Sequence, residues 1–162
     1  MDYLWAPWRM EYVKNANKEQ QSCIFCIDSD TSDDLKNLII KRGKSALVIM
    51  NKYPYNNGHL MVSPNTHTSE FDKLPRDTQI EMMKLVSQSM RILKKTIHPD
   101  GFNFGANFGT AAGAGIKDHL HLHIVPRWDG DTNFMPAIGN TKVQVLSLIE
   151  MCELLSKKFS KY

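Results

Sequence analysis

The stretch HLHLHIV, residues 119–125, decides what kind of fold and chemistry this chain has. It alternates His119, His121 and His123 with aliphatic residues. Because successive side chains of a β-strand point to opposite faces, the alternation predicts a strand with three imidazoles on one face and aliphatic side chains in the core. Imidazoles two residues apart on a strand are separated by about 6.7 Å, and the outer pair by about 13 Å. Three imidazoles at that spacing cannot easily share one zinc ion through bonds of about 2.0 Å, so at least two different functions are expected.

A glycine-rich loop, GTAAGAG at residues 109–115, leads into this strand. Such a loop can direct several backbone N–H groups at a phosphate, although a Gly/Ala loop taken alone is usually a simple turn. A phosphate-binding loop beside an imidazole favours nucleophilic attack by histidine on phosphorus, which is a known covalent strategy.

Cys23 and Cys26 form a CxxC pair far from the histidines in sequence. No second CxxC pair is present, so a zinc site would need histidine ligands as well. A redox pair and two plain structural cysteines are the alternatives, and a redox CxxC would be expected in a βαβ pattern that is not evident here. The histidines considered as ligands are His59, His67, His98 and His119.

Two further apolar stretches predict a β-hairpin. Residues 45–51 (SALVIMN) and 58–63 (GHLMVS) have strand length, and the turn-forming residues YPYNNG at 53–58 separate them. Residues 102–108 alternate aromatic with small or polar residues and predict another strand. Strands joined by short turns, with helices inserted between them, favour an α+β fold with a mainly antiparallel sheet.

Two amphipathic helices are predicted from apolar residues that recur every three or four positions. The first covers residues 75–97, and the second covers residues 141–159, where Thr141 and Gln144 form a capping-box pattern. The predicted apolar faces are Ile80, Met83, Val86, Met90, Leu93 and Ile97 in the first helix, and Val145, Leu148, Ile149, Cys152, Leu155 and Phe159 in the second.

Length and composition restrict the class of protein. The chain has 162 residues, a net charge of +3 and 42% hydrophobic residues, which suit one globular domain. Its longest apolar runs are strand-sized, far below the roughly 18 residues of a membrane span, and residues 1–12 show no signal-peptide pattern. Three cysteines indicate a reducing compartment, and a surplus of three positive charges is too small to imply nucleic acid. We therefore expect a cytoplasmic protein that binds neither nucleic acid nor membranes.

The run at 119–125 matches the signature HφHφHφφ, in which φ is a hydrophobic residue, so the chain resembles the histidine triad (HIT) superfamily of nucleotide hydrolases and transferases. Other landmarks are similar, namely Asn51, residues 58–64, His67 and residues 125–127. Three segments resemble a bacterial and archaeal branch similar to diadenosine tetraphosphate phosphorylases, namely residues 4–9, 23–26 and 127–134.

This resemblance implies a five-stranded, mainly antiparallel sheet with two principal helices, and sheets joined across a homodimer. It implies a single HIT domain over residues 1–162, with an N-terminal extension at 1–22, a core at 23–135 and a C-terminal helix at 136–162. It further implies cleavage of dinucleoside polyphosphates, of the diadenosine tetraphosphate type, at the α-phosphate. The alternatives are a nucleoside phosphoramidase and a nucleotide-binding regulatory module without significant turnover.

The resemblance also implies roles for individual residues. His121 matches the family nucleophile, which forms a nucleotidyl-histidine intermediate, and His123 matches the residue that contacts the phosphate and assists the leaving group. Asn51 falls where the family binds ribose, and ribose and phosphates would be held by Asn107, Ala114, Gly115 and Ile116. In zinc-carrying members the ligands match Cys23, Cys26, His67 and His119, and no organic cofactor is implied. His59 occupies a landmark position for which a supporting hydrogen bond is expected instead of metal ligation.

The acceptor of the nucleotidyl group is either water or phosphate. The branch resemblance favours phosphate, which would need backbone N–H groups or cations beside the leaving-group site. Lys117 and Arg127 flank the histidine strand and could supply positive charge, although both could equally be solvated strand ends.

Overall fold

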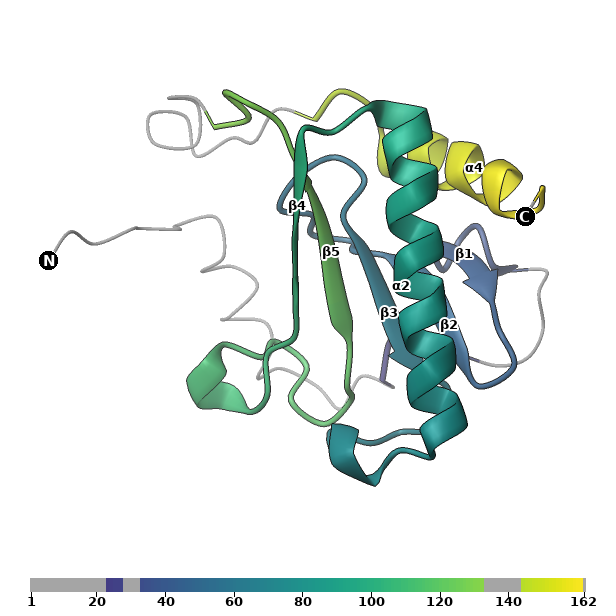
Figure 1. Cartoon of the computed structure of the whole chain (residues 1–162), viewed down its shortest axis with the longest axis vertical. Helices are drawn as coiled ribbons and strands as arrows, with labels where there is room; N and C mark the ends of the chain where they lie inside the picture. Colours follow the sequence, from purple (N-terminus) through teal and green to yellow (C-terminus); the bar gives the residue numbers. More distant parts are fainter. Residues whose placement is uncertain (1–22, 28–32, 133–143, 162) are drawn as a thin grey trace, which may run out of the picture.

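Five strands form one antiparallel sheet in the order β1-β2-β3-β5-β4 (Figure 1). The computed structural model describes residues 23–27, 33–132 and 144–161. The strands are β1 (Ile39–Arg42), β2 (Ala46–Met50), β3 (Leu60–Pro64), β4 (Gly101–Gly105) and β5 (Leu122–Arg127). The antiparallel sheet and the α+β class are therefore confirmed, and β1 is a strand that the sequence patterns had not indicated.

The predicted hairpin is formed by β2 and β3, whose residues are all buried. The two strands pair without a break from Ala46 opposite Pro64 to Met50 opposite Leu60. Gly58 in the connecting loop has a φ of +78°, and a Cβ there would lie 2.7 Å from Ile97 Cδ1. Glycine is needed at this position because the backbone is left-handed and helix α2 approaches it closely.

The other two predicted strands have different bounds in the structure. Strand β4 ends at Gly105, so residues 106–108 are not part of it, and β5 begins at Leu122, after His119 and His121. The hydrogen bonds between β3 and β5 end there because Leu120 makes other hydrogen bonds. Its N–H donates to the Thr68 carbonyl, and its carbonyl accepts from Ser63 Oγ. His123 lies inside the sheet, paired with Met61 on β3 and Gly105 on β4.

Helix α2 (Arg76–Ile97) confirms the first predicted helix, with Pro75 as its N-cap. Its buried face is rotated from the predicted one: Ile80 is 43% exposed and Met83 is 47% exposed. The core positions are taken by Thr78, Met82, Leu85, Val86, Ser89, Ile92 and Leu93. A buried serine costs little here because the Ser89 hydroxyl donates to the Leu85 carbonyl of its own helix (2.7 Å).

Helix α4 (Leu148–Phe159) is shorter than the helix predicted over 141–159. Ser147 and Glu150 form its capping box, so the predicted box of Thr141 and Gln144 is wrong. Residues 144–147 are not helical, whereas Thr141 lies outside the described residues. Val145 and Ile149 are exposed, and the buried face is Met151, Cys152, Leu155 and Phe159.

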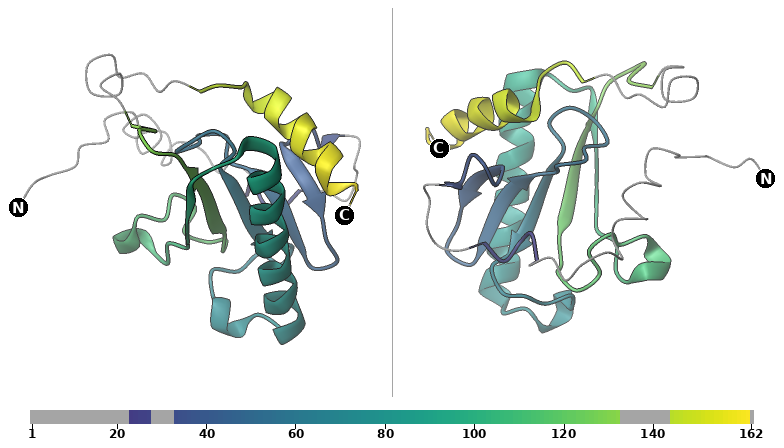
Figure 2. Two further views of the ribbon diagram at one scale, coloured as in Figure 1. Left: turned by 45° about the horizontal axis from the view of Figure 1, so that its top comes forward. Right: turned by 180° about the vertical axis from the view of Figure 1, so that it is seen from behind.

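Helix α2 covers one face of the sheet (Figure 2). Helix α2 packs on β2, β3 and β5, and α4 packs on β1 and α2. Seen from behind, the strands lie in front of α2 (Figure 2, right). Pro126 is on the α2 side, since the Gly58 position contacts it together with Leu93 and Ile97 of that helix. His123, three residues earlier on β5, therefore points to the face away from α2.

Two structural observations bear on the predicted organisation. The predicted extension at 1–22 and the first part of the predicted C-terminal segment, 136–143, lie outside the described residues. Among the described residues, no helix combines the length and the apolar character needed to cross a membrane.

Candidate active site and metal centre

Four side chains from three separate segments meet at one end of the sheet. Cys23 and Cys26 belong to the turn at 23–27, His67 to the loop after β3, and His119 to the chain just before β5. Their candidate ligand atoms all lie within 4.8 Å of one another. The His119 Nδ1 atom is 3.2 Å from Cys23 Sγ, 3.6 Å from Cys26 Sγ and 3.2 Å from His67 Nδ1.

This cluster fits a tetrahedral metal ion. Bonds of about 2.3 Å to sulfur and about 2.05 Å to nitrogen give ligand-to-ligand distances of about 3.4–3.6 Å for the pairs that involve nitrogen. The His119 Nε2 atom is 2.9 Å from the Pro64 carbonyl, so Nε2 carries the hydrogen and Nδ1 directs its lone pair into the cluster. Burial lowers the pKa of His119, which favours the neutral form that a ligand needs.

His121 is held in one tautomer by the backbone. Its Nδ1–H donates to the His119 carbonyl at 2.9 Å, which leaves Nε2 with a free lone pair. The residue is only 6% exposed, and burial lowers its pKa although the hydrogen bond to the carbonyl opposes that effect. A neutral imidazole with one bare nitrogen is the form in which histidine acts as a nucleophile.

His123 is oriented by His59, which is fully buried. The Tyr55 N–H donates to His59 Nδ1 at 3.1 Å, so the neutral His59 ring carries its hydrogen on Nε2. That Nε2–H donates to His123 Nδ1 at 3.0 Å, which places the hydrogen of neutral His123 on Nε2. The His121 and His123 rings are nearly perpendicular, with centroids 4.8 Å apart. One ring thus offers a lone pair and its neighbour offers an N–H.

His59 therefore gives the supporting hydrogen bond expected of it. It belongs to no metal cluster among the described residues, where the ligand group consists of the four side chains above. Asn51 lies at the far side of His59: its Nδ2 is 3.3 Å from His59 Nδ1, and its Oδ1 accepts from the Tyr53 N–H at 2.9 Å.

The glycine-rich loop offers fewer backbone donors than its sequence suggests. The Ala114 N–H already donates to the Gly109 carbonyl at 3.2 Å. Within the described residues, no hydrogen bond engages the N–H of Gly115 or Ile116, so these two groups remain available to a phosphate. Asn107 makes one long contact, from Nδ2 to the Gly113 carbonyl at 3.5 Å.

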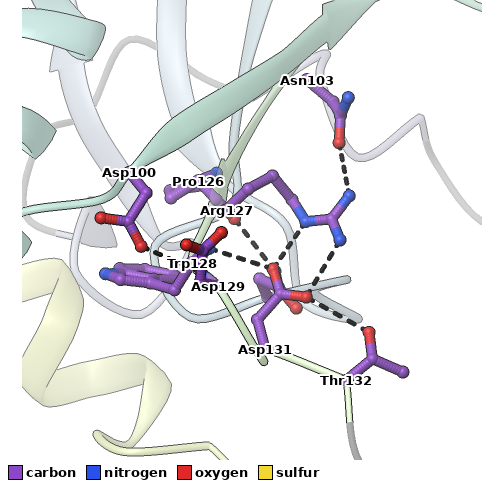
Figure 3. Close-up of polar contacts among 9 residues, drawn as sticks. Asp100, Asn103, Pro126, Arg127, Trp128, Asp129, Asp131 and Thr132 are labelled. Carbon is purple, nitrogen blue, oxygen red and sulfur yellow. Dashed lines mark hydrogen bonds and ion pairs between the residues drawn. The ribbon is translucent and has the colours of Figure 1, made fainter.

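A groove of about 430 Å³ runs beside His123 and includes Asn107. One wall is an ion pair in which Arg127 donates to both carboxylate oxygens of Asp131, at 2.6 and 2.9 Å (Figure 3). Arg127 also donates to Asn103 Oδ1 at 2.7 Å, and Asn56 donates to Asp131 at 2.7 Å. These hydrogen bonds, chiefly those from Arg127, hold the pKa of Asp131 well below its usual range.

The Arg127–Asp131 ion pair affects which of the two cations beside the histidine strand, Lys117 or Arg127, can contact an anionic ligand. The charge of Arg127 is already balanced by Asp131 and its guanidinium is anchored on three oxygens. Lys117 is exposed and forms no ion pair with any described residue. Lys117 is therefore the better candidate for contact with an anionic ligand.

The sequence profile of the HIT domain matches residues 33–130, which include the row of histidines and most of the groove lining. The chain belongs to the HIT-domain family. It is 37% identical to the AP-4-A phosphorylase of Mycobacterium tuberculosis over 98% of this chain and 84% of that one. This likeness over nearly the whole length places the chain among the enzymes of the HIT family.

Solved structures of two HIT proteins have the same fold. A zinc-bound histidine triad family protein from Mycobacterium smegmatis is 27% identical, with a TM-score of 0.65 over 86% of this chain and 94% of that one. A histidine triad nucleotide-binding protein from Sulfolobus tokodaii is 26% identical, with a TM-score of 0.65 over 86% of this chain and 93% of that one.

Sequence patterns missed three residues of this site. Phe25, between the two cysteines, stacks on His121; Tyr55 orients and stacks on His59; and Asp131 pairs with Arg127. For Asp131 a signal existed, since an acidic residue four positions after Arg127 can reach it across a turn. No local sequence pattern indicates Phe25 or Tyr55. Phe25 contacts His121, which lies far away in the sequence, and Tyr55 contacts His59 from a loop.

Proposed function

We propose that this enzyme is a nucleotidyl hydrolase or transferase that cleaves dinucleoside polyphosphates, of the diadenosine tetraphosphate type, at the α-phosphate. The observation that carries the proposal is the fixed pair of tautomers: a bare Nε2 on His121 beside an Nε2–H on His123. The name of the mycobacterial relative, AP-4-A phosphorylase, supports this substrate class.

In the proposed first step, His121 Nε2 attacks the α-phosphorus and the bond from phosphorus to the bridging oxygen breaks. The electron pair of that bond leaves with the nucleotide product as a phosphate oxyanion, to which the His123 Nε2–H donates a hydrogen bond. In the second step, water or inorganic phosphate attacks the nucleotidyl-histidine, the proton of the acceptor passes to solvent, and His121 leaves with the electron pair of its bond to phosphorus. Both steps use His121 Nε2.

We assign substrate binding to the residues around this pair. Asn51, beside His59, is proposed to bind ribose. Asn107 is proposed to contact ribose or phosphate in the groove that it shares with His123. The segment Ala114, Gly115 and Ile116 is proposed to bind the phosphates, with the contacts made by the N–H groups of Gly115 and Ile116, since that of Ala114 is already used.

The metal proposed for Cys23, Cys26, His67 and His119 is zinc, because two thiolates and two imidazoles at these distances match its preferred ligand set. A zinc ion bound there would supply stability to this end of the sheet. All four positions around it are filled by protein, so its role is structural, and no organic cofactor is proposed. We also propose a cytoplasmic homodimer, since three cysteines, an odd number, favour a reducing compartment.

The test uses diadenosine tetraphosphate and isotopically labelled phosphate. We expect the parent protein to place label in the ADP that it forms, and His121→Ala to lose at least about 10³-fold in turnover while still binding nucleotide. AMP formation at an equal rate without phosphate, with no label in any nucleotide, would make the enzyme a hydrolase. Turnover of His121→Ala within tenfold of the parent would exclude the covalent mechanism.

A nucleotidyl-histidine intermediate can be sought directly. Protein mixed with substrate and quenched at high pH should gain the mass of one nucleotidyl group, because phosphorus–histidine bonds survive base and not acid. The His121→Ala protein is the matched control and should gain no mass.

A further inference from the structure

Phe25 lies between the two cysteines of the metal cluster, and its ring packs on two of the three histidines. The centroid of the Phe25 ring is 5.1 Å from that of His119 and 5.0 Å from that of His121. The Phe25 and His121 planes are inclined by only 27°, so these two rings are stacked. The Phe25 side chain is 1% exposed and belongs to the hydrophobic core.

Phe25 is held by core packing and by the turn that carries the two cysteines of the metal cluster. Within residues 23–27, the backbone makes one hydrogen bond between described residues, from the Cys26 N–H to the Cys23 carbonyl, and this bond stays inside the turn. The turn is joined to the sheet by the two cysteine side chains, which reach His67 and His119, and by packing of apolar side chains. A metal ion bound by Cys23 and Cys26 would therefore hold the Phe25 ring in place as well.

Among the residues that the structure describes, the His121 imidazole makes one hydrogen bond that sets its orientation, from Nδ1 to the His119 carbonyl. Rotation of such a ring about its χ2 angle has broad, shallow minima, so a single hydrogen bond does not by itself fix the plane. Stacking of Phe25 on the ring, with the edge-on contact of His123, restricts that rotation. The direction of the Nε2 lone pair depends on the same rotation.

We propose that Phe25 is a positioning residue for the nucleophile: the metal-bound turn presses the Phe25 ring on His121 and so keeps its Nε2 lone pair aimed at the substrate. The metal cluster then contributes to the reaction through this apolar contact, without touching the reacting atoms. This inference rests on the proposed role of His121.

The experiment compares Phe25→Ala, Phe25→Leu and Phe159→Ala in the zinc-loaded full-length protein. Phe159 is the matched control, because it is also a phenylalanine that is 1% exposed but belongs to α4, which packs on β1 and α2. Zinc content is measured, together with kcat and KM for diadenosine tetraphosphate. The long-range 1H–15N spectrum of the imidazoles shows which nitrogen carries the hydrogen.

We expect Phe25→Ala to keep its zinc, to lose about 10- to 100-fold in kcat with KM within about threefold of the parent, and to show His121 as a mixture of tautomers. Phe25→Leu should recover part of the kcat, since a branched apolar side chain still covers the ring. Phe159→Ala should leave kcat and the His121 signals unchanged at a temperature at which it is folded.

The inference is overturned if zinc-loaded Phe25→Ala keeps the parental kcat and the parental His121 signals. It is also overturned if Phe159→Ala lowers kcat as much, because the loss would then follow from stability alone. If Phe25→Ala does not fold, the same criteria apply to Phe25→Leu. A His121→Ala protein that still turns over substrate would show separately that the proposed function is wrong. In that case the spectrum still shows whether Phe25 orients the His121 ring.

Discussion

The three histidines of HLHLHIV have three different hydrogen-bond partners, and the partners determine what each ring can do. His119 and His121 each donate to a backbone carbonyl, through Nε2 in the first case and Nδ1 in the second. His123 accepts from another histidine, His59. One residue type can therefore take the three proposed roles of metal ligand, nucleophile and hydrogen-bond donor, because the nitrogen that is already bonded sets the tautomer.

At this scale the first prediction concerns His59→Phe. Phenylalanine fills the buried space but removes the donor to His123 and leaves the Tyr55 N–H without its acceptor. We expect the free energy of unfolding to fall by about 1–3 kcal/mol, because a buried donor loses its partner. We expect kcat to fall about tenfold or more, because His123 then carries its hydrogen on Nε2 only part of the time.

His59→Gln is the matched variant for that prediction. Its amide nitrogen can lie near the position of the His59 Nε2 atom and keep a donor to His123, so its kcat should be clearly higher than that of His59→Phe. Urea unfolding and steady-state kinetics measure the two effects. Equal kcat values for the two variants would mean that the hydrogen bond from His59 does not set the state of His123.

The sequence predicts which side chains share a face better than it predicts which residues those side chains contact. The alternation at 119–125 predicted which side chains share a face, since that follows from strand geometry alone. The partners of these rings are the Pro64 carbonyl, His59 and Phe25, and each is more than 50 residues away from the ring that it contacts. No local pattern encodes such contacts, because they depend on how β3, β5 and the turn at 23–27 come together.

At the scale of an element, the proposed zinc ion would hold the turn at 23–27 through Cys23 and Cys26. We predict about one zinc ion per chain in protein prepared without chelator, and loss of that zinc with a lower melting temperature in Cys23→Ser. The reason is that ligand binding free energy adds to folding free energy wherever the site exists only in the folded chain.

Cys152→Ala is the control for the zinc prediction. Cys152 is fully buried in α4, away from the cluster, so its replacement lowers stability through packing but should leave the zinc content unchanged. Elemental analysis and thermal unfolding give the two readouts. Parent protein that contains no metal would contradict the assignment of the four ligands.

Helix α2 is tied to the turn between β1 and β2 by one carboxylate. Glu81 accepts from the Lys44 and Ser45 N–H groups, both at 2.7 Å, and from the Ser45 hydroxyl. Burial raises the pKa of Glu81, but these hydrogen bonds together outweigh burial and the pKa is lowered below its ordinary value of 4.5. A group with a lowered folded pKa stabilises the protein above the pKa of the unfolded chain, and this contribution is lost as the pH falls through the folded pKa.

We therefore predict that Glu81→Gln lowers the free energy of unfolding at pH 7 by about 1–2 kcal/mol, because the amide replaces charge-assisted hydrogen bonds. The difference from the parent should shrink as the pH falls below the ordinary glutamate pKa of 4.5 and through the lower pKa of folded Glu81, because the parent carboxylate then becomes protonated. Glu153→Gln, at an exposed position of α4, should change stability by less than about 0.5 kcal/mol. A difference between parent and Glu81→Gln that stays constant from pH 7 to pH 3 would contradict the assignment.

The elements show where sequence periodicity stops being informative. The existence of α2 followed from its apolar period, but its buried face did not, because Ser89 and Thr78 occupy core positions that a hydrophobic pattern gives to Ile80 and Met83. For α4, Thr141 with Gln144 and Ser147 with Glu150 are equally good local patterns, and tertiary packing of the helix on β1 and α2 selects the second.

At the scale of the whole molecule, the sheet has two unequal edges. Edge strand β1 carries a bulge between Ile39 and Lys41 and is covered by α4. Edge strand β4 is regular, and among the described residues no element pairs with its outer side. A regular open edge favours pairing with another strand, and β4 exposes 45% of Phe104 there.

We therefore predict that the protein is a homodimer of about twice 18.5 kDa whose two sheets meet at β4. Phe104→Asp should shift the mass towards the monomer, because pairing of two β4 strands would bring two carboxylates into an apolar contact. Ile149→Asp makes the same substitution at a residue that is also 45% exposed, but on α4, and should remain dimeric. Light scattering at micromolar concentration measures both. A monomeric parent would overturn the predicted dimer. If Ile149→Asp dissociates and Phe104→Asp does not, the interface lies on helix α4 instead of the edge of the sheet, because the added charges disrupt a two-fold contact only where they lie within it.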